Sequence, residues 1–127
     1  MLKREDQCSK EIIGAAIEVH RYLGPGLLES TYEECLCREF AIQGLYFERQ
    51  KPLGVLYKDV KLDCGYRLDI VVEGLVILEL KTVDSIQPIH EAQLLTYLKL
   101  SKLNLGILLN FNVAMLKDGI KRIVHNL

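Results

Sequence analysis

The segment Tyr66 to Lys81, YRLDIVVEGLVILELK, places the charged residues Asp69, Glu79 and Lys81 among apolar neighbours. The apolar runs predict two strands of a hairpin that is buried on both faces. Buried carboxylates are costly unless they are paired or bound to a metal ion. Two carboxylates and the main-chain carbonyl of Leu80 are oxygen ligands that suit Mg²⁺ or Mn²⁺, and such an ion lowers the pKa of a bound water and neutralises charge on a phosphate. With Lys81 to position the water and the scissile phosphate, this set fits hydrolysis of a phosphodiester.

The turn of the hairpin decides whether the two carboxylates can act together. With a two-residue loop, Asp69 and Glu79 project from opposite faces of the sheet. With a three-residue loop at 72–74 and Gly74 in the left-handed conformation, Asp69, Glu79 and Lys81 share one face. The carboxylates are then one diagonal step apart, roughly 7–8 Å between backbone positions. Glycine at the third loop position favours this arrangement. A simpler alternative is an ion pair between Glu79 and Lys81 at a strand end, with Asp69 at a sheet edge.

Polar residues on two predicted helices could complete the site. Gln93 and Tyr97 are four residues apart in a helix predicted from Pro88 to about Lys102, so they lie on one face. Glu29 lies in the first turn of a helix predicted from about Leu27 to Gln43, where the helix dipole stabilises a carboxylate. For each of these residues an ordinary structural role remains an alternative. The same holds for the histidines His20 and His90, and Glu33 and Glu34 read as solvated surface.

The elements that position these residues follow from the periodicity of apolar side chains. Residues 5–22 predict a first helix, which the glycine–proline segment 23–26 ends. The predicted strands are 45–50, 53–62 (bulged or broken at Gly54 or around Lys58-Asp59), two within 66–81, 105–112 and 120–125. The predicted order is therefore α-α-β-β-β-β-α-β-β. This is an α/β fold of the mixed α+β kind, with a central mixed sheet flanked by helices.

Composition restricts the class of protein. A chain of 127 residues, half of them apolar and 26% charged, predicts one soluble domain over residues 1–127. No stretch approaches the ~18–20 uninterrupted apolar residues of a membrane span. The charged N-terminus lacks a hydrophobic signal core, so we expect a cytoplasmic location and reduced cysteines. The net charge of −1 gives no overall attraction to nucleic acid, so any such contact has to come from a local patch.

Taken together, the motifs resemble the PD-(D/E)XK nuclease superfamily. The Asp69…Glu79-Leu80-Lys81 hairpin is similar to its metal-binding core, and Gln93-x-x-x-Tyr97 resembles the extra motif of the RecB-type exonuclease branch. More narrowly, four segments resemble the small bacterial GxxExxY proteins: GPGLLESTYEECL, YRLDIVVEG, LELKTV and EAQLLTYLKL. The residues of the motif that names this family are here Gly26, Glu29 and Tyr32. The resemblance extends from about Ile12 to Val124.

The resemblance implies a restriction-endonuclease-like core and metal-dependent cleavage of nucleic acid, with DNA favoured over RNA. By position, Asp69 and Glu79 would bind Mg²⁺ or Mn²⁺, and Lys81 would be the catalytic lysine. Glu29 would be an additional acid that reaches the metal directly or through water. RecB-type enzymes often carry an upstream histidine ligand, and either His20 or Glu29 could take that place.

Gln93 and Tyr97 would order the rim of the site or contact the substrate phosphate. The alternative function is a non-catalytic, nuclease-like module that binds nucleic acid or a protein partner. The sequence also leaves open a homodimer, or nuclease activity within a larger complex.

Overall fold

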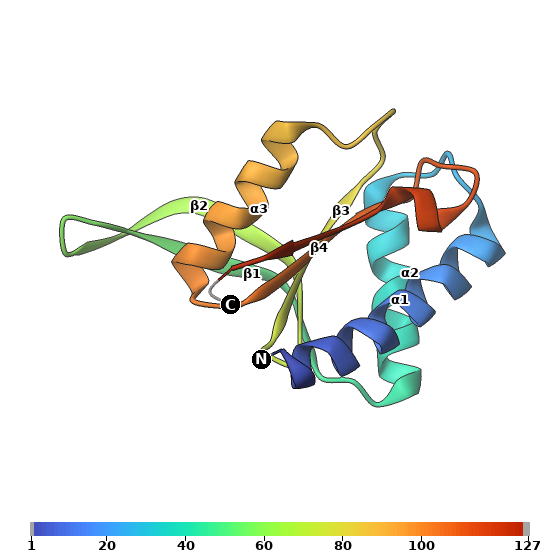
Figure 1. The fold of residues 1–127 in the computed structure, drawn as a ribbon, viewed down its shortest axis with the longest axis horizontal. Helices are drawn as coiled ribbons and strands as arrows, with labels where there is room; N and C mark the ends of the chain where they lie inside the picture. Colours follow the sequence, from blue (N-terminus) through green and yellow to red (C-terminus); the bar gives the residue numbers. More distant parts are fainter. Residues whose placement is uncertain (1, 126–127) are drawn as a thin grey trace.

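The computed structural model describes residues 2–125, which form a five-stranded sheet covered by helices (Figure 1). The elements in chain order are α1 (Lys3–Leu23), α2 (Glu29–Gln43), β1 (Phe47–Tyr57), β2 (Val60–Val72), β3 (Val76–Lys81), α3 (Pro88–Ser101), β4 (Leu105–Asn110), the short 3-10 helix η1 (Leu116–Gly119) and β5 (Ile120–Val124). The strands lie in the order β1-β2-β3-β4-β5. Only the β3–β4 pair within this part of the chain is parallel, and α3 forms the crossover between its two strands.

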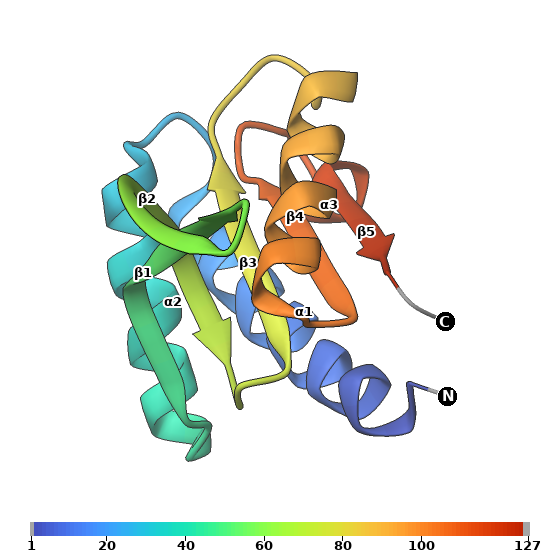
Figure 2. The same cartoon turned by 90° about the vertical axis from the view of Figure 1, so that its left-hand side faces the viewer.

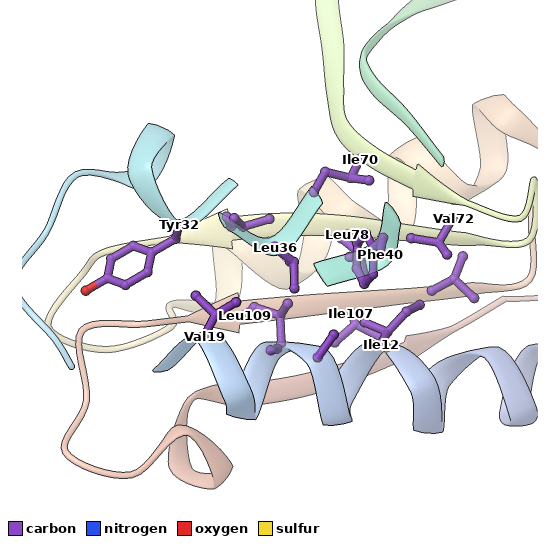
Figure 3. Close-up of a cluster of buried hydrophobic side chains, with 14 of the residues drawn as sticks. Ile12, Val19, Tyr32, Leu36, Phe40, Ile70, Val72, Leu78, Ile107 and Leu109 are labelled. Atoms are coloured by element: carbon purple, nitrogen blue, oxygen red, sulfur yellow. The ribbon is translucent and has the colours of Figure 1, made fainter. Parts of the chain in front are cut away.

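Helices cover both faces of the sheet, with α1 and α2 on one face and α3 on the other (Figure 2). The larger core cluster lies between the sheet and the α1–α2 pair (Figure 3), and its members include Ile12, Val19, Tyr32, Leu36, Phe40, Ile70, Val72, Leu78, Ile107 and Leu109. A smaller cluster lies under α3 and contains Leu53, Leu68, Val71, Ile77, Leu94, Tyr97, Leu98 and Leu108. Because β3 and β4 are covered on both faces, they are almost uniformly apolar. The acidic residue Glu79 is therefore unexpected in the middle of β3, where its neighbours are buried and apolar.

The helix boundaries follow from local sequence. Pro88 begins α3, where its missing N–H is no loss. The Gln87 N–H donates to Nδ1 of His90, and the two side chains form a capping box. His90 is therefore a helix-capping residue. Gly44 ends α2 in the left-handed conformation, with φ 75°.

The predicted fold class is confirmed, but the count of strands before α3 is three instead of the predicted four. Segments 45–50 and 53–62 were predicted as separate strands, whereas β1 runs through Pro52 as a single strand. Proline is tolerated there because β1 is an edge strand of the sheet. The register shifts between Leu53 and Val55, and the chain reverses at Lys58-Asp59, where both residues have positive φ. Both sites of disruption that the sequence indicated are thus present.

The helices in residues 2–125 all lack the combination of length and apolar character that crossing a membrane requires.

Candidate active site

The β2–β3 hairpin has a three-residue loop, but not the one that the sequence predicted. The paired residues are Ile70↔Leu78, Val71↔Ile77 and Val72↔Val76, which leaves 73–75 as the loop instead of 72–74. The register therefore differs from the predicted one by two residues. A shift of two leaves every side chain on its predicted face, whereas a shift of one would have reversed them. Asp69 consequently lies level with Glu79 and not one diagonal step away.

The regular backbone pairing between β2 and β3 stops at Ile70. Beyond that point, the side-chain carboxylates of Asp69 and Glu79 bond to the backbone of the opposite strand. The backbone N–H of Asp69 donates to Oε2 of Glu79 at 2.9 Å. In return, the backbone N–H of Leu80 donates to Oδ2 of Asp69 at 2.8 Å. Each carboxylate is thus bound by a main-chain group of the opposite strand. This reciprocal pair holds both side chains in fixed orientations where the two strands separate.

A bend in β2 accompanies this separation. Leu68 and Val71 both belong to the cluster under α3, although three residues apart in a regular strand they would face opposite ways. On the neighbouring strand β1, the residue level with Asp69 is Gln50, which has φ 48°. A non-glycine residue in this region marks local strain. We attribute the bend of β2 at Asp69 to the irregular backbone of Asp69 and of Gln50, the position opposite it on β1.

Lys81 ends β3, and its backbone is fixed by the neighbouring strand. Lys81 is level with Asn110 of β4, and its carbonyl accepts the N–H of Phe111 at 3.0 Å. The buried Asn110 side chain accepts from the Val83 N–H at 3.1 Å and donates to the Val83 carbonyl at 2.8 Å. Asn110 therefore anchors the segment that leaves Lys81. Sequence reasoning missed this role, for which the only indication was the two amides of Asn110 and Asn112 in the apolar segment 105–112.

Burial and mutual repulsion act together on the carboxylates. Burial, and then the charge of Asp69, raises the pKa of Glu79 from its ordinary 4.5 to about 8. Burial also raises the pKa of Asp69, against the effect of its bond from the Leu80 N–H. The charge of Lys81 lowers both pKa values by a smaller amount. Glu79 therefore holds a proton near neutral pH, and the pair gains its second negative charge only when that proton is lost.

Glu29 is near this pair but does not join it. It is exposed at the first position of α2, and its charge raises the pKa of both Asp69 and Glu79. Within residues 2–125, no group of three or more His, Cys, Asp or Glu side chains is arranged to hold a metal ion. The structure thus brings two of the three predicted carboxylates together.

Tyr97 and Gln93 are neighbours one turn apart on α3. Tyr97 is buried in the cluster that contains Leu68 and Ile77, and burial followed by the charge of Glu79 raises its pKa. Gln93 is exposed. The ring of Tyr97 is 6.1 Å, centroid to centroid, from the ring of Tyr66 on β2. Sequence reasoning did not single out Tyr66, because nothing in its spacing relates it to α3.

Glu33 is buried, which contradicts its interpretation as a solvated residue. Arg49 donates to its Oε2 from Nη2 at 2.9 Å and from Nε at 3.2 Å, and Gln50 donates to its Oε1 at 2.8 Å. Glu33 thus connects α2 to the irregular position of β1 opposite Asp69. Its charge also contributes to raising the pKa of Asp69.

The remaining motif residues have structural roles. The Tyr32 hydroxyl donates to the Gly24 carbonyl at 2.5 Å and accepts from the Leu27 N–H at 3.2 Å, while its ring stacks on Phe111 at 4.4 Å. Tyr32 therefore fixes the loop that contains Gly26 and leads to Glu29. His20 is buried, and its Nε2 is 2.9 Å from the Val113 carbonyl. That bond ties α1 to the connection between β4 and β5.

The chain is similar to one family of known proteins over most of its length. The family model described as the PD-(D/E)XK nuclease superfamily matches residues 6–123, a range that contains every residue discussed above for the site. No curated protein and no solved structure matches the chain significantly.

Proposed function

Because the chain belongs to the PD-(D/E)XK nuclease superfamily, we propose that it is a metal-dependent nuclease that hydrolyses phosphodiester bonds of DNA. The observation that carries the proposal is the reciprocal bonding of Asp69 and Glu79 across the opened hairpin. That arrangement keeps two acids together in a buried place where their charges repel each other. A core that only needed stability would be better served by apolar residues.

The donor set fits a small, hard cation. We assign Asp69, Glu79 and the main-chain carbonyl of Leu80 as ligands of Mg²⁺ or Mn²⁺, which accept oxygen ligands and retain several waters. When bound, the cation would lower the pKa of a water molecule and neutralise charge that develops on the phosphate. We assign Glu29 as a further acid that acts through water, since it is exposed at the start of α2 and not clustered with the pair.

The other residues of the site have roles that do not depend on holding the cation. Lys81 follows the pair on the same strand, and we assign it to orient the attacking water and the scissile phosphate. We assign Tyr97, which is buried, to limit the access of bulk water to the acids, and Gln93, which is exposed, to offer an amide to a substrate phosphate. Together these groups fit a positioned in-line attack on a phosphodiester.

We also propose the narrower assignment to the GxxExxY proteins and to the RecB-type branch. Its support is the Gly26, Glu29 and Tyr32 motif and the Gln93 and Tyr97 pair at the site. The contacts of Tyr32 give a physical reason for that motif, since they fix the loop that presents Glu29. We also propose a cytoplasmic location, and a homodimer or a larger complex as the assembly in which the protein acts.

The second candidate function is a nuclease-like module that binds nucleic acid or protein without cleaving. The observation that favours it is the high pKa of Glu79, because a carboxyl protonated near neutral pH is a poor metal ligand. Thermal unfolding with and without millimolar Mg²⁺ or Mn²⁺ separates the two functions. A cation that binds the native state raises its apparent stability, and an unchanged melting temperature with both ions favours the module.

The direct test is cleavage of end-labelled DNA and RNA, single-stranded, duplex and with overhangs, in Mg²⁺ or Mn²⁺. We expect cleavage that chelation of the metal stops and that Lys81→Ala abolishes. Lys10→Ala, which removes an exposed lysine on α1, is the matched control and should cleave like the wild type. Absence of cleavage on every substrate with both ions would refute the nuclease assignment.

A further inference from the structure

An exposed aromatic ring lies just outside the proposed active site. Tyr66 of β2 is 46% exposed, whereas its neighbour Tyr97 is 7% exposed. The two rings are tilted by 59°, with their centroids 6.1 Å apart, a geometry typical of aromatic pairs. Tyr97 packs in the same cluster as Leu68, which precedes Asp69, and Ile77, which is two residues before Glu79, so the two rings lie beside the strands that carry the acids. Tyr66 is the more exposed ring of the pair.

The strand that carries Tyr66 leaves it uncovered. Residues 60–67 of β2 are exposed throughout, and burial begins only at Leu68. Figure 1 shows the far part of the β1–β2 hairpin projecting beyond the helices and the rest of the sheet. Single exposed apolar residues on a surface need no explanation. Tyr66 differs because it contacts a residue of the site and precedes the acid Asp69 by three positions on the same strand.

We propose that Tyr66 is a stacking platform for an unpaired base of the nucleic-acid substrate, beside the phosphate that is cleaved. Every base has a π-face, so stacking on an aromatic side chain binds single strands without selecting a sequence. In a duplex both faces of an internal base are covered by its neighbours, so the platform is available only to a single strand, an overhang or a frayed end. This inference rests on the proposed function and names its substrate as DNA with unpaired bases.

The position of Tyr66 on β2 limits which base can use the platform. Tyr66 precedes Asp69 by three positions on the same strand, so a base on its exposed face belongs to a nucleotide close to the scissile phosphate. Tyr66 is therefore a specificity-determining residue that contacts substrate, distinct from the groups that carry out hydrolysis. Substitution of Tyr66 should affect the affinity for substrate more than the rate of cleavage by the bound complex.

The test is a titration of labelled oligonucleotides in Mg²⁺, followed by fluorescence anisotropy. The Lys81→Ala background prevents cleavage during the measurement. Tyr66→Ala should weaken single-strand binding by about 5- to 150-fold, the equivalent of ~1–3 kcal/mol per stacked base. Tyr66→Phe keeps the ring and should bind within about twofold of the parent. Tyr57→Ala, which removes an exposed tyrosine at the tip of the same hairpin, is the matched control and should bind normally.

A series of oligonucleotides with one abasic site moved along the strand identifies stacking itself. At one position the missing base should weaken binding of the parent, and Tyr66→Ala should then cause no further loss. Blunt duplex should bind equally to the parent and to Tyr66→Ala. The inference would be overturned if Tyr66→Ala lost affinity equally for all substrates. It would also be overturned if Tyr66→Ala, with unchanged thermal unfolding, bound single strands as tightly as the parent.

The binding readout keeps this inference separable from the nuclease assignment. Cleavage by the wild type together with normal single-strand binding by Tyr66→Ala refutes the platform alone. Base-dependent binding through Tyr66 without any cleavage by the wild type supports the platform and refutes the nuclease. A protein that binds no oligonucleotide refutes the platform outright.

Discussion

Replacing Glu79 by glutamine should stabilise the metal-free protein, and increasingly so as the pH rises. The glutamine keeps a side-chain oxygen for the Asp69 N–H, so the bond across the hairpin survives. What the substitution removes is a charge in a place that is 7% exposed and already adjacent to Asp69. Active-site residues are commonly retained at the expense of stability, and this substitution measures that cost directly.

The size of the effect follows from the pKa of Glu79. In the unfolded chain this carboxyl loses its proton near 4.5, and in the folded chain near 8. Between these pH values the folded state holds a proton that the unfolded state has released, so folding takes up protons and stability falls as pH rises. The full shift corresponds to roughly 3–6 kcal/mol at pH 9, and to about 1 kcal/mol or less at pH 5.

The assay is urea unfolding of the wild type and Glu79→Gln in chelator and reducing agent, at pH 5, 7 and 9. We expect the difference in free energy of unfolding to grow at each step, in favour of the variant. Glu18→Gln, which changes an exposed glutamate on α1, is the matched control and should give a small difference that does not vary with pH. A flat difference for Glu79→Gln would refute the reasoning, because it would mean that Glu79 does not change protonation on folding.

Three further predictions concern the metal and the supports of the site. Mn²⁺ should raise the melting temperature of the wild type more at pH 8 than at pH 6, because binding of the ion requires loss of the proton from Glu79. Asp69→Asn should reduce this increase. An equal increase at both pH values would contradict the prediction. Asn110→Leu should lower the free energy of unfolding by about 1–3 kcal/mol, because it leaves the Val83 N–H and the Asn112 N–H without their acceptor and removes the shorter of the two bonds to the Val83 carbonyl. Urea unfolding measures that loss, and Asn112→Leu on the adjoining connection is the comparison, because the Asn112 side chain has only the longer 3.5 Å contact with the Val83 carbonyl. Tyr32→Phe should cost about 0.5–2 kcal/mol by removing the hydroxyl that joins Gly24 to Leu27, with the stack on Phe111 retained; the same measurement giving no loss would show that the loop does not depend on this hydroxyl.

Features that depend on the sequence of a single segment could be predicted. The convergence of Asp69 and Glu79 required only that the loop contain an odd number of residues, and the pattern around Gly74 indicated this. The exact register did not follow, because loops at 72–74 and 73–75 leave the same side chains on the same face. The sequence predicted separate strands at 45–50 and 53–62, whereas one strand runs through Pro52 because β1 is an edge strand, which is a tertiary fact.

The parts that sequence reasoning missed depend on contacts between distant elements. Glutamate is usually a surface residue, and only the approach of α2 to β1 brings Glu33 to Arg49 and Gln50. Tyr66 meets Tyr97 only because β2 bends next to Asp69 and α3 packs on that face. No periodicity within a single segment encodes either contact.

The central claim is that Asp69 and Glu79 jointly hold a divalent cation. Anomalous diffraction from crystals soaked in Mn²⁺ at pH 8 tests it most directly. The account predicts one strong peak bound by carboxylate oxygens of both residues, near the Leu80 carbonyl, and its loss in Asp69→Asn crystals. A map without a peak between the two carboxylates, with the Asp69 and Leu80 N–H groups still bonded across the hairpin as in the metal-free protein, would contradict the account.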